Sequence, residues 1–251
     1  MPSLLLRWRF FVLLALLMLA LLWPLHALVQ NYYLDGLQRK NGQTLDLFAA
    51  NLSGTLKRYE VLPQVLGRLP EVQNALLNPQ QPDRLEAANH LLYRIQQQTH
   101  ADVVYLLDPG GTTIAASNWQ DERSFVSHNF AYRPYFSEAL AQRTGTFFAL
   151  GNISAKRGYY FGNAVYVDEV VVGVLVVKVD LDFTESLWGN TPERLAVTDN
   201  HGVVIFSSEP EWRFRSSRQL TAEELEQVAE HQPYSSLEPV LLELPASQWL
   251  R

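Results

Sequence analysis

The sequence predicts an α+β fold in which a long helix precedes antiparallel sheets, behind an uncharged N-terminal segment that is long enough to cross a membrane. Three observations carry this prediction. Residues 10–29 contain no Asp, Glu, Lys or Arg, apolar residues recur at steps of three or four through residues 34–59, and short apolar runs separated by turn residues begin at residue 103. The change from a helical period to short apolar runs is typical of the start of a sheet.

The uncharged segment, residues 10–29, predicts a transmembrane helix. At ~1.5 Å per residue it would span roughly 30 Å, the thickness of a bilayer core. Arg7 and Arg9 precede the segment and the next basic residue is Arg39. The positive-inside rule therefore places residues 1–9 in the cytoplasm and the remainder of the chain outside it. A cleaved signal peptide is the alternative, although no clear small-x-small cleavage site follows the segment.

Composition narrows the classes of function. A net charge of −6 argues against a nucleic-acid partner, because phosphate binding requires a basic face. The chain has no cysteine, which excludes disulfides and thiol catalysis, and its six histidines show no metal-ligand spacing. The signature motifs of serine hydrolases, P-loop proteins and zinc proteases are missing as well. We therefore expect no cofactor, no metal and no catalytic site in this chain.

Residues 30–66 are predicted to form a long stalk helix directly outside the membrane. Two such helices could pair in a dimer, with Asn41 as a polar interruption of the seam. The alternative is that the same stripe packs on the chain's own globular module. The stripe consists of Leu34, Leu37, Asn41, Leu45, Phe48, Leu52, Leu56 and Tyr59.

A first globular module is predicted over residues 67–190. Residues 84–100 and 133–143 read as helices, and Asp168-Glu169 reads as the turn of a hairpin. Five antiparallel strands with helices on one face of the sheet form an α+β module of the PAS-like kind. The strands are expected at residues 103–108, 112–117, 146–150, 159–167 and 170–181.

A second module, residues 191–251, repeats the beginning of the first. In both, an aliphatic strand ends in an aspartate, a turn containing glycine follows, and a second strand returns. The chain reaches Arg251 after about three strands, so this module is expected to be incomplete. Its elements are expected at residues 195–199 (strand), 203–207 (strand), 221–230 (helix) and 237–244 (strand).

Candidate binding residues gather around the sheet of the first module. Arg133 stands among aromatic residues at the start of a helix, a combination that favours carboxylates. Residues 151–160 form a polar loop that leads into an aromatic strand. Lys178 lies within an otherwise apolar strand, where a lysine is costly unless a counter-charge meets it. Strand alternation places Lys178 and Asp180 on one face. Either these two form an internal ion pair, or the lysine lies on an exposed edge, or it binds an anionic ligand.

At these residues the chain resembles the extracytoplasmic double-Cache (tandem PAS-like) sensor region of C4-dicarboxylate sensor histidine kinases, the DctB type. The resemblance extends from the N-terminal segment to about Arg218, and its motifs occur in the order that the family shows. The motifs are Ser117-Asn118-Trp119, Asn129 with Tyr132-Arg133-Pro134-Tyr135-Phe136, Arg157-Gly158-Tyr159-Tyr160 and Val177-Lys178-Val179-Asp180.

The resemblance implies a membrane-distal module that detects succinate, fumarate or malate, a homodimer formed through the stalk helix, and signalling through a kinase to a response regulator. It also implies a location in the bacterial inner membrane with the sensor in the periplasm. Arg133 and Lys178 would then hold the two carboxylates. The residues that would supply hydrogen bonds or walls are Tyr135, Ser154, Tyr159 and Tyr160, and which of the paired tyrosines faces the ligand stays open.

The chain departs from the family pattern because no second membrane span and no kinase core follow. Binding is therefore expected of this chain, and kinase activity only of a full-length parent. Two alternatives stay open. One is a double-Cache sensor for another small anion or an amino acid, for which Asp180 is the obvious acceptor of the ammonium group. The other is a stand-alone anchored protein that pairs with a partner receptor through its stalk.

Overall fold

The structure is a computed structural model that describes residues 39–186, 194–235 and 237–243, together with the single residues His26, Tyr32 and Gly36. The chain divides into two units, Met1–Ser53 and Gly54–Arg251, and every described strand belongs to the second unit.

The membrane span predicted for residues 10–29 lies outside the described residues, apart from His26. Among the residues that are described, none of the helices is both long and apolar enough to cross a bilayer.

Residues 39–60 are helical, as predicted for the stalk, and α2 (Leu62–Leu66) follows after a break at Val61. Pro63 lies in the first turn of α2 and has no N–H group to continue the preceding helix. Near this end the stripe packs on its own module, because Tyr59 contacts the core and donates a hydrogen bond to Thr99 O at 3.1 Å. Farther back, Leu45 is 54% exposed.

The first module is built on a five-stranded sheet in the order β2-β1-β5-β4-β3, with all neighbouring strands antiparallel. This confirms the predicted antiparallel α+β arrangement, with strand ends that differ from the prediction by one or two residues. The strands are β1 (Val103–Leu107), β2 (Thr113–Ala116), β3 (Thr144–Leu150), β4 (Arg157–Val167) and β5 (Val170–Asp180).

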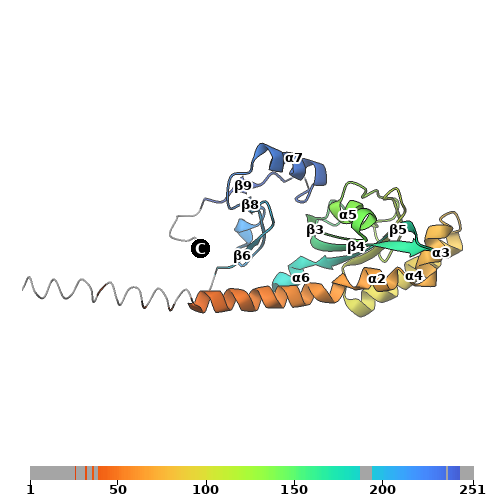
Figure 1. Cartoon of the computed structure of the whole chain (residues 1–251), viewed down its shortest axis with the longest axis horizontal. Coiled ribbons are helices and arrows are strands. Elements are labelled where there is room, and N and C mark those ends of the chain that lie inside the picture. Colours follow the sequence, from red (N-terminus) through yellow and green to blue (C-terminus); the bar gives the residue numbers. More distant parts are fainter. Residues whose placement is uncertain are drawn as a thin grey trace, which may run out of the picture. The chain divides into compact units, whose positions relative to one another are not determined.

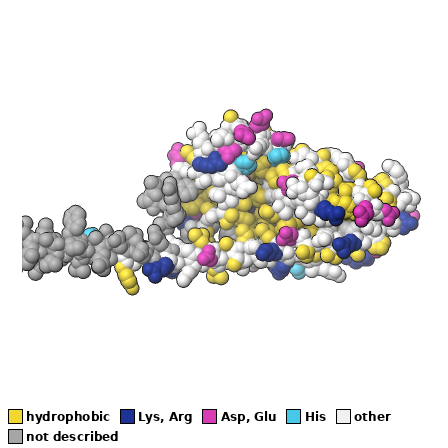
Figure 2. All heavy atoms as spheres, in the orientation of Figure 1, with side chains coloured by type: hydrophobic (Ala, Val, Ile, Leu, Met, Phe, Trp, Pro, Cys, Tyr) yellow, Lys and Arg dark blue, Asp and Glu magenta, His cyan; other side chains and the backbone are white. Residues whose placement is uncertain are grey.

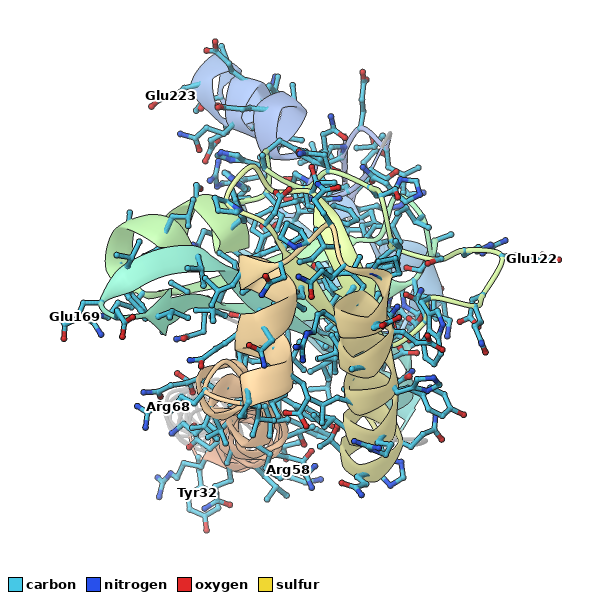
Figure 3. All side chains as sticks on the ribbon, turned by 90° about the vertical axis from the view of Figure 1, so that its right-hand side faces the viewer. Tyr32, Arg58, Arg68, Glu122, Glu169 and Glu223 are labelled. Atoms are coloured by element: carbon cyan, nitrogen blue, oxygen red, sulfur yellow. The ribbon has the colours of Figure 1, made fainter. Side chains whose placement is uncertain are left out.

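The hairpin turn between β4 and β5 lies where the sequence predicts it. Asp168 and Glu169 have φ values of 48° and 67°. Two successive positive φ angles define the turn type whose twist matches that of antiparallel strands. Glu169 consequently lies at the outer tip of the hairpin (Figure 3).

The prediction of helices on one face of the sheet is wrong, because helices cover both faces. Helix α5 lies on one face, whereas α2 and α4 lie on the other (Figure 1). All of these helices and α3 carry a proline in their first two positions, where the fixed φ angle suits the first turn and no hydrogen bond is lost. The remaining helices of the module are α3 (Pro70–Leu77), α4 (Pro82–Thr99) and α5 (Pro134–Gln142).

Strand alternation divides the core into two clusters, one for each face. Val104 and Leu106 point toward α3 and α4, whereas Tyr105 and Leu107 point toward α5. On the α5 side, the loop over residues 117–132 adds Phe125 and Phe130 as further cover, and its outer part carries Glu122 away from the sheet (Figure 3). The face beneath α5 is therefore enclosed by a helix and a loop.

In its described part, the second module has two small sheets. Strands β6 and β7 are antiparallel, β8 and β9 are parallel, and a capping box at Thr221 and Glu224 begins α7. The strand predicted over residues 237–244 is wrong in length, because only Val240–Leu241 is a strand within the described residues 237–243. The elements from α6 onward are α6 (Leu181–Ser186), β6 (Ala196–Thr198), β7 (Val204–Ser207), η1 (Pro210–Trp212), β8 (Arg215–Ser216), α7 (Ala222–His231) and β9 (Val240–Leu241).

The predicted repeat is visible in hydrogen bonds. Asp108 Oδ1 accepts from the N–H groups two and four residues later, at 2.9 and 2.8 Å. Asp199 Oδ1 does the same in the second module, at 2.9 and 3.0 Å. Each aspartate thus organises a turn through its own side chain, which is why the two turns share an Asp at the same place.

Candidate ligand-binding site

Lys178 lies near the end of β5, and its side chain is fully buried on the α5 side of the sheet. Its Nζ donates hydrogen bonds to Asp102 Oδ2 at 2.5 Å and to Ser154 Oγ at 2.8 Å. Burial lowers the pKa of Lys178, and the negative charge of Asp102 opposes that shift. The lysine is not on an exposed edge, since a carboxylate and a hydroxyl hold it inside the module.

The carboxylate against Lys178 comes from Asp102, which the sequence analysis did not single out. The register of β1 and β5 pairs Val103 with Lys178, and Asp102 N donates to Lys178 O at 2.8 Å. Asp180, the partner that sequence alternation suggested, instead lies 3.6 Å from Lys156 Nζ and accepts a hydrogen bond from the backbone of Asp182. The internal ion pair of Lys178 therefore involves the residue that precedes β1.

A glycine makes room for the lysine side chain. Gly158 on β4 lies beneath the stem of Lys178, and a Cβ atom added there would be 2.5 Å from Lys178 Cε. Carbon atoms that are not bonded do not approach so closely, so any larger residue would displace the lysine. Gly158, a residue of the predicted motif, thus contributes to the site because its lack of a side chain leaves room for Lys178.

Ser154 reaches Lys178 through a tight loop. Gly151 N donates to Lys156 O at 2.9 Å and Ala155 N donates to Gly151 O at 2.8 Å, which folds residues 151–156 back on themselves. A Cβ on Gly151 would collide with Ser154 Oγ and lie 3.3 Å from the Tyr160 hydroxyl. The loop therefore brings Ser154, Tyr160 and Lys178 around one point.

Three buried tyrosines form the wall beside the lysine. The rings of Tyr135 and Tyr160 are stacked, with centroids 5.2 Å apart and planes 7° from parallel. Tyr105 donates its hydroxyl hydrogen to Tyr135 Oη at 2.7 Å. Burial raises the pKa of all three phenols well above 10.0, so at neutral pH they act as neutral hydrogen-bonding groups.

The paired tyrosines of β4 point to opposite faces. Tyr160 belongs to the cluster beneath α5, and Lys178 Nζ lies 5.9 Å from the centroid of its ring. Tyr159 is opposite Phe148 across the ladder and contacts Phe161 at 5.1 Å between centroids. The side chain of Tyr159 is therefore on the face away from Lys178.

Arg133 is the residue immediately before α5, and its side chain is buried. Its Nη1 donates to two carbonyl oxygens of the second module, His231 O at 3.1 Å and Gln232 O at 2.8 Å. Its guanidinium carbon lies 5.0 Å from the ring centroid of Tyr132 and 5.8 Å from that of Phe147. The arginine is thus wedged between aromatic rings with one nitrogen occupied.

The hydroxyl of Tyr160 is affected by two charged groups of the site, Arg133 and Asp102. Burial is the main cause of its raised pKa, while the charge of Arg133 lowers that pKa and the charge of Asp102 raises it. Both groups are therefore within electrostatic reach of the same hydroxyl. The structure brings together Arg133, Lys178, Tyr135, Tyr160 and Ser154 on one face, and leaves Tyr159 and Asp180 out of direct contact with the lysine.

Two buried cations beside neutral hydroxyl groups form an environment for a small anion, in which Lys178 shares its charge with Asp102. Within the described ranges, no group of His, Cys, Asp and Glu has the geometry to hold a metal ion.

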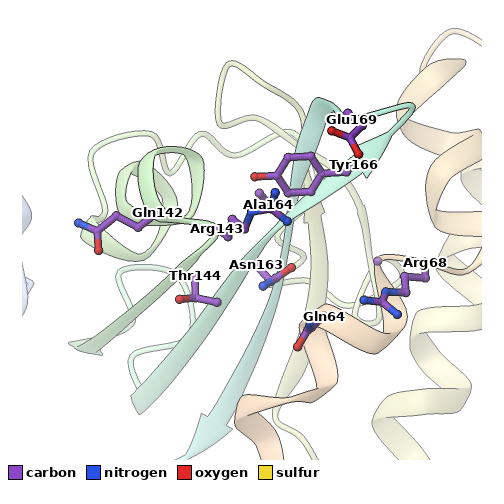
Figure 4. A pocket seen from close by; sticks show the side chains of 10 residues that line it. Gln64, Arg68, Gln142, Arg143, Thr144, Asn163, Ala164, Tyr166 and Glu169 are labelled. Atoms are coloured by element: carbon purple, nitrogen blue, oxygen red, sulfur yellow. The ribbon is translucent and has the colours of Figure 1, made fainter.

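One cavity of the first module lies away from these residues. A cavity of about 480 Å³ lies at the hairpin end of the sheet, away from Lys178, with Arg143 beside the Tyr166 ring and Gln64 and Arg68 projecting from the α2 side (Figure 4). Both arginine side chains are exposed to water, where charge pairs are screened and bind weakly. This cavity lacks the buried charges of the Lys178 site.

A second cavity, of about 330 Å³, lies where β3 and β4 meet the second module. Hydrophobic side chains gather at the surface below α7 in this region (Figure 2). Its lining includes Phe147, Phe148, Tyr159, Ile205 and Pro233.

Comparison with known proteins identifies the chain's relatives. No protein-family model matches it. The chain is 52% identical to the C4-dicarboxylate transport sensor protein DctB of Pseudomonas aeruginosa over 97% of its own length, and it spans 40% of the length of that relative.

Solved structures agree with this relation. The V. cholerae histidine kinase DctB sensor domain matches with a TM-score of 0.79 and 35% identity, over 83% of this chain and 81% of that chain. The sensory domain of the Campylobacter jejuni chemoreceptor Tlp3 shares the fold, with a TM-score of 0.54 and 16% identity over 67% of this chain and 70% of that one. The resemblance predicted from the motifs is confirmed: the chain belongs to the DctB sensor-domain family.

Proposed function

We propose that this chain is the extracytoplasmic sensor region of a two-component histidine kinase, and that its first module binds a C4-dicarboxylate such as succinate, fumarate or malate. One observation carries the proposal: a fully buried Lys178 shares a face of the sheet with a buried Arg133. The P. aeruginosa relative, named a C4-dicarboxylate transport sensor protein, supports it.

The chemistry of a dicarboxylate suits these two anchors. Its two charges lie at opposite ends of a short carbon chain, so binding inside a protein needs two separate cations. Arg133 precedes α5 and Lys178 lies on β5, where its Nζ is 5.9 Å from the centroid of the Tyr160 ring. Tyr135 and Ser154 supply further hydrogen-bonding groups.

We further propose the arrangement of the chain around the membrane. Residues 1–9 are cytoplasmic, residues 10–29 span the bacterial inner membrane, and residues 30–66 form a stalk that pairs in a homodimer. Residues 67–190 are then the membrane-distal ligand module and residues 191–251 the membrane-proximal module, both in the periplasm. The parent kinase signals to a response regulator.

An amino acid ligand is the second candidate, because Asp102 places a carboxylate within the site. An ammonium group would need that carboxylate as its partner. Asp102, however, already faces Lys178 Nζ at 2.5 Å and Lys156 Nζ at 3.8 Å. An ammonium group would have to displace a lysine from this acceptor, whereas a ligand carboxylate would not.

Calorimetry on the whole chain in detergent tests the proposal, with succinate as the probe. Removing one anchor leaves a desolvated ligand carboxylate unpaired, which costs ~2–5 kcal/mol of binding. Arg133→Ala and Lys178→Met should therefore each weaken succinate by roughly 30-fold or more. The controls Arg94→Ala and Lys57→Ala remove exposed cations on helices away from the site and should change the affinity little.

The proposal fails if folded Arg133→Ala and Lys178→Met variants bind succinate as tightly as the parent. Binding of amino acids without any binding of dicarboxylates would replace it by the second candidate. Thermal melting of each variant separates a lost ligand contact from a lost fold.

A further inference from the structure

The ligand site touches a segment of the second module. Residues 231–234, which we call the strap, begin at the last residue of α7. Three backbone carbonyls of the strap accept hydrogen bonds from the first module. The bonds are Arg133 Nη1 to His231 O at 3.1 Å, Arg133 Nη1 to Gln232 O at 2.8 Å and Leu150 N to Pro233 O at 2.7 Å.

The strap bridges two elements of the site. Arg133 precedes α5, whereas Leu150 ends β3 and leads into the loop that carries Ser154. A side-chain contact reinforces the bridge, because Asn152 Nδ2 donates to Gln232 Oε1 at 3.1 Å and to Tyr132 Oη at 2.9 Å. The strap therefore ties the arginine side of the site to the serine loop.

The strap is itself held firmly by the second module. Tyr234 is fully buried, and its hydroxyl donates to the Asp199 carboxylate that organises the β6–β7 turn. Pro233 is buried as well, and Gln232 N closes α7 by donating to Val228 O at 2.9 Å. The strap carbonyls are thus fixed in position by contacts independent of Arg133.

These fixed carbonyls decide which edge of Arg133 is available. A guanidinium has five N–H donors in a planar fork. Both strap bonds use Nη1, and among the described residues Nε and Nη2 of Arg133 have no hydrogen-bond partner. The Nε–Nη2 edge is one of the two that bind a carboxylate through parallel hydrogen bonds.

We infer that the strap is a positioning element of the ligand site: its carbonyls hold Arg133 Nη1 so that the Nε–Nη2 edge meets a ligand carboxylate. This inference rests on the proposed function. A ligand that binds the oriented arginine stabilises the strap contact in turn, because coupling between two sites is reciprocal. The second module thereby sets the affinity of the first and responds to its ligand.

A matched pair of substitutions at Gln232 tests the role of the strap backbone. Gln232 has φ 48° and ψ 48°, a left-handed conformation that glycine adopts easily and proline cannot. Gln232→Pro moves the carbonyls, and Gln232→Gly removes the same side chain while permitting the native backbone. Succinate should bind the proline variant at least tenfold more weakly than the glycine variant, both measured by calorimetry on the whole chain.

Hydrogen exchange gives a second readout that needs no variant. Succinate should slow amide exchange in peptides that cover Leu150 and residues 231–234, since Leu150 N donates to the strap. A structural tether without a positioning role would leave this exchange unchanged on ligand addition.

The outcomes separate the two proposals. If the parent binds succinate, but the Gln232 variants bind equally and exchange does not change, the strap inference is overturned while the proposed function stands. If the parent binds no dicarboxylate, the proposed function fails and the strap inference falls with it.

Discussion

Replacing Lys178 by methionine is expected to destabilise the chain far less when Asp102 is neutralised at the same time. Lys178 is fully buried and Asp102 is 14% exposed, with 2.5 Å between Nζ and Oδ2. Breaking a buried ion pair by removing one partner costs ~3–5 kcal/mol, whereas replacing both partners by uncharged groups is often neutral. The two single variants and the double variant therefore form an informative cycle.

The magnitudes follow from what each variant leaves behind. Asp102→Asn leaves a buried ammonium without its carboxylate, and the lysine can escape that cost by losing its proton. Bringing the pKa from 10.5 to neutral pH costs about 5 kcal/mol at ~1.4 kcal/mol per unit, which is an upper bound for this variant. Lys178→Met leaves Asp102 near Lys156, at 3.8 Å, and should cost about 3 kcal/mol.

Urea unfolding of the whole chain, followed by tryptophan fluorescence, measures the cycle. The double variant should be more stable than the sum of the single losses by roughly 2–3 kcal/mol. Lys156→Met is the matched control: it removes a lysine near the same carboxylate, but one that is 54% exposed, and should cost less than about 1 kcal/mol. Additive losses in the cycle would refute the reasoning that the buried pair acts as a unit.

Two further outcomes are expected. Burial raises the pKa of Tyr105, Tyr135 and Tyr160 above their ordinary value of 10.0, so these phenols ionise first in the unfolded chain and the free energy of unfolding should fall as the pH rises beyond about 10. Absorbance at 295 nm should show more tyrosinate in the unfolded than in the folded chain at pH 10.5. Equal titration of the folded and unfolded chains would contradict this prediction. Leu45→Cys should cross-link on mild oxidation in membranes more readily than Gln43→Cys on the opposite side of the helix, and a lack of cross-linking at every position of the stripe would argue against the stalk dimer.

The sequence predicted the first module well because its strands are buried apolar runs. Strand β5 needs no tertiary information to be recognised, since Val170–Asp180 contains one charged residue before its end. The second module was harder. Arg215–Ser216 becomes a strand only by pairing with Val240–Leu241, and two residues carry no periodicity that a sequence pattern could show.

The site was predictable in its residue types but not in its contacts. A lysine in an apolar strand and an arginine at a helix start both indicate a binding role from sequence alone. Asp102 becomes a candidate only when the β1–β5 register is known, because it precedes an ordinary buried strand. Gly158 serves the site because it has no side chain and so leaves space for Lys178. A sequence pattern does not show which side chain fills that space.

Arg157 is another residue whose contacts could not be predicted from the sequence, and it forms a second link between the modules. It is 4% exposed, and its Nη1 donates to Ile205 O at 2.8 Å while its Nη2 donates to Glu185 Oε2 at 2.5 Å. Burial acts to lower the pKa of Arg157, but its hydrogen bonds to Glu185 and Asp182 outweigh that effect and raise it. The guanidinium therefore stays charged in the interior.

Both arginine links end on backbone carbonyls of the second module. Arg133 binds those of His231 and Gln232, and Arg157 binds that of Ile205. Every residue carries a carbonyl group, so no residue type in the second module marks it as the partner of an arginine. Sequence patterns therefore identify these arginines as unusual within the first module. That they also join it to the second follows only from the folded chain.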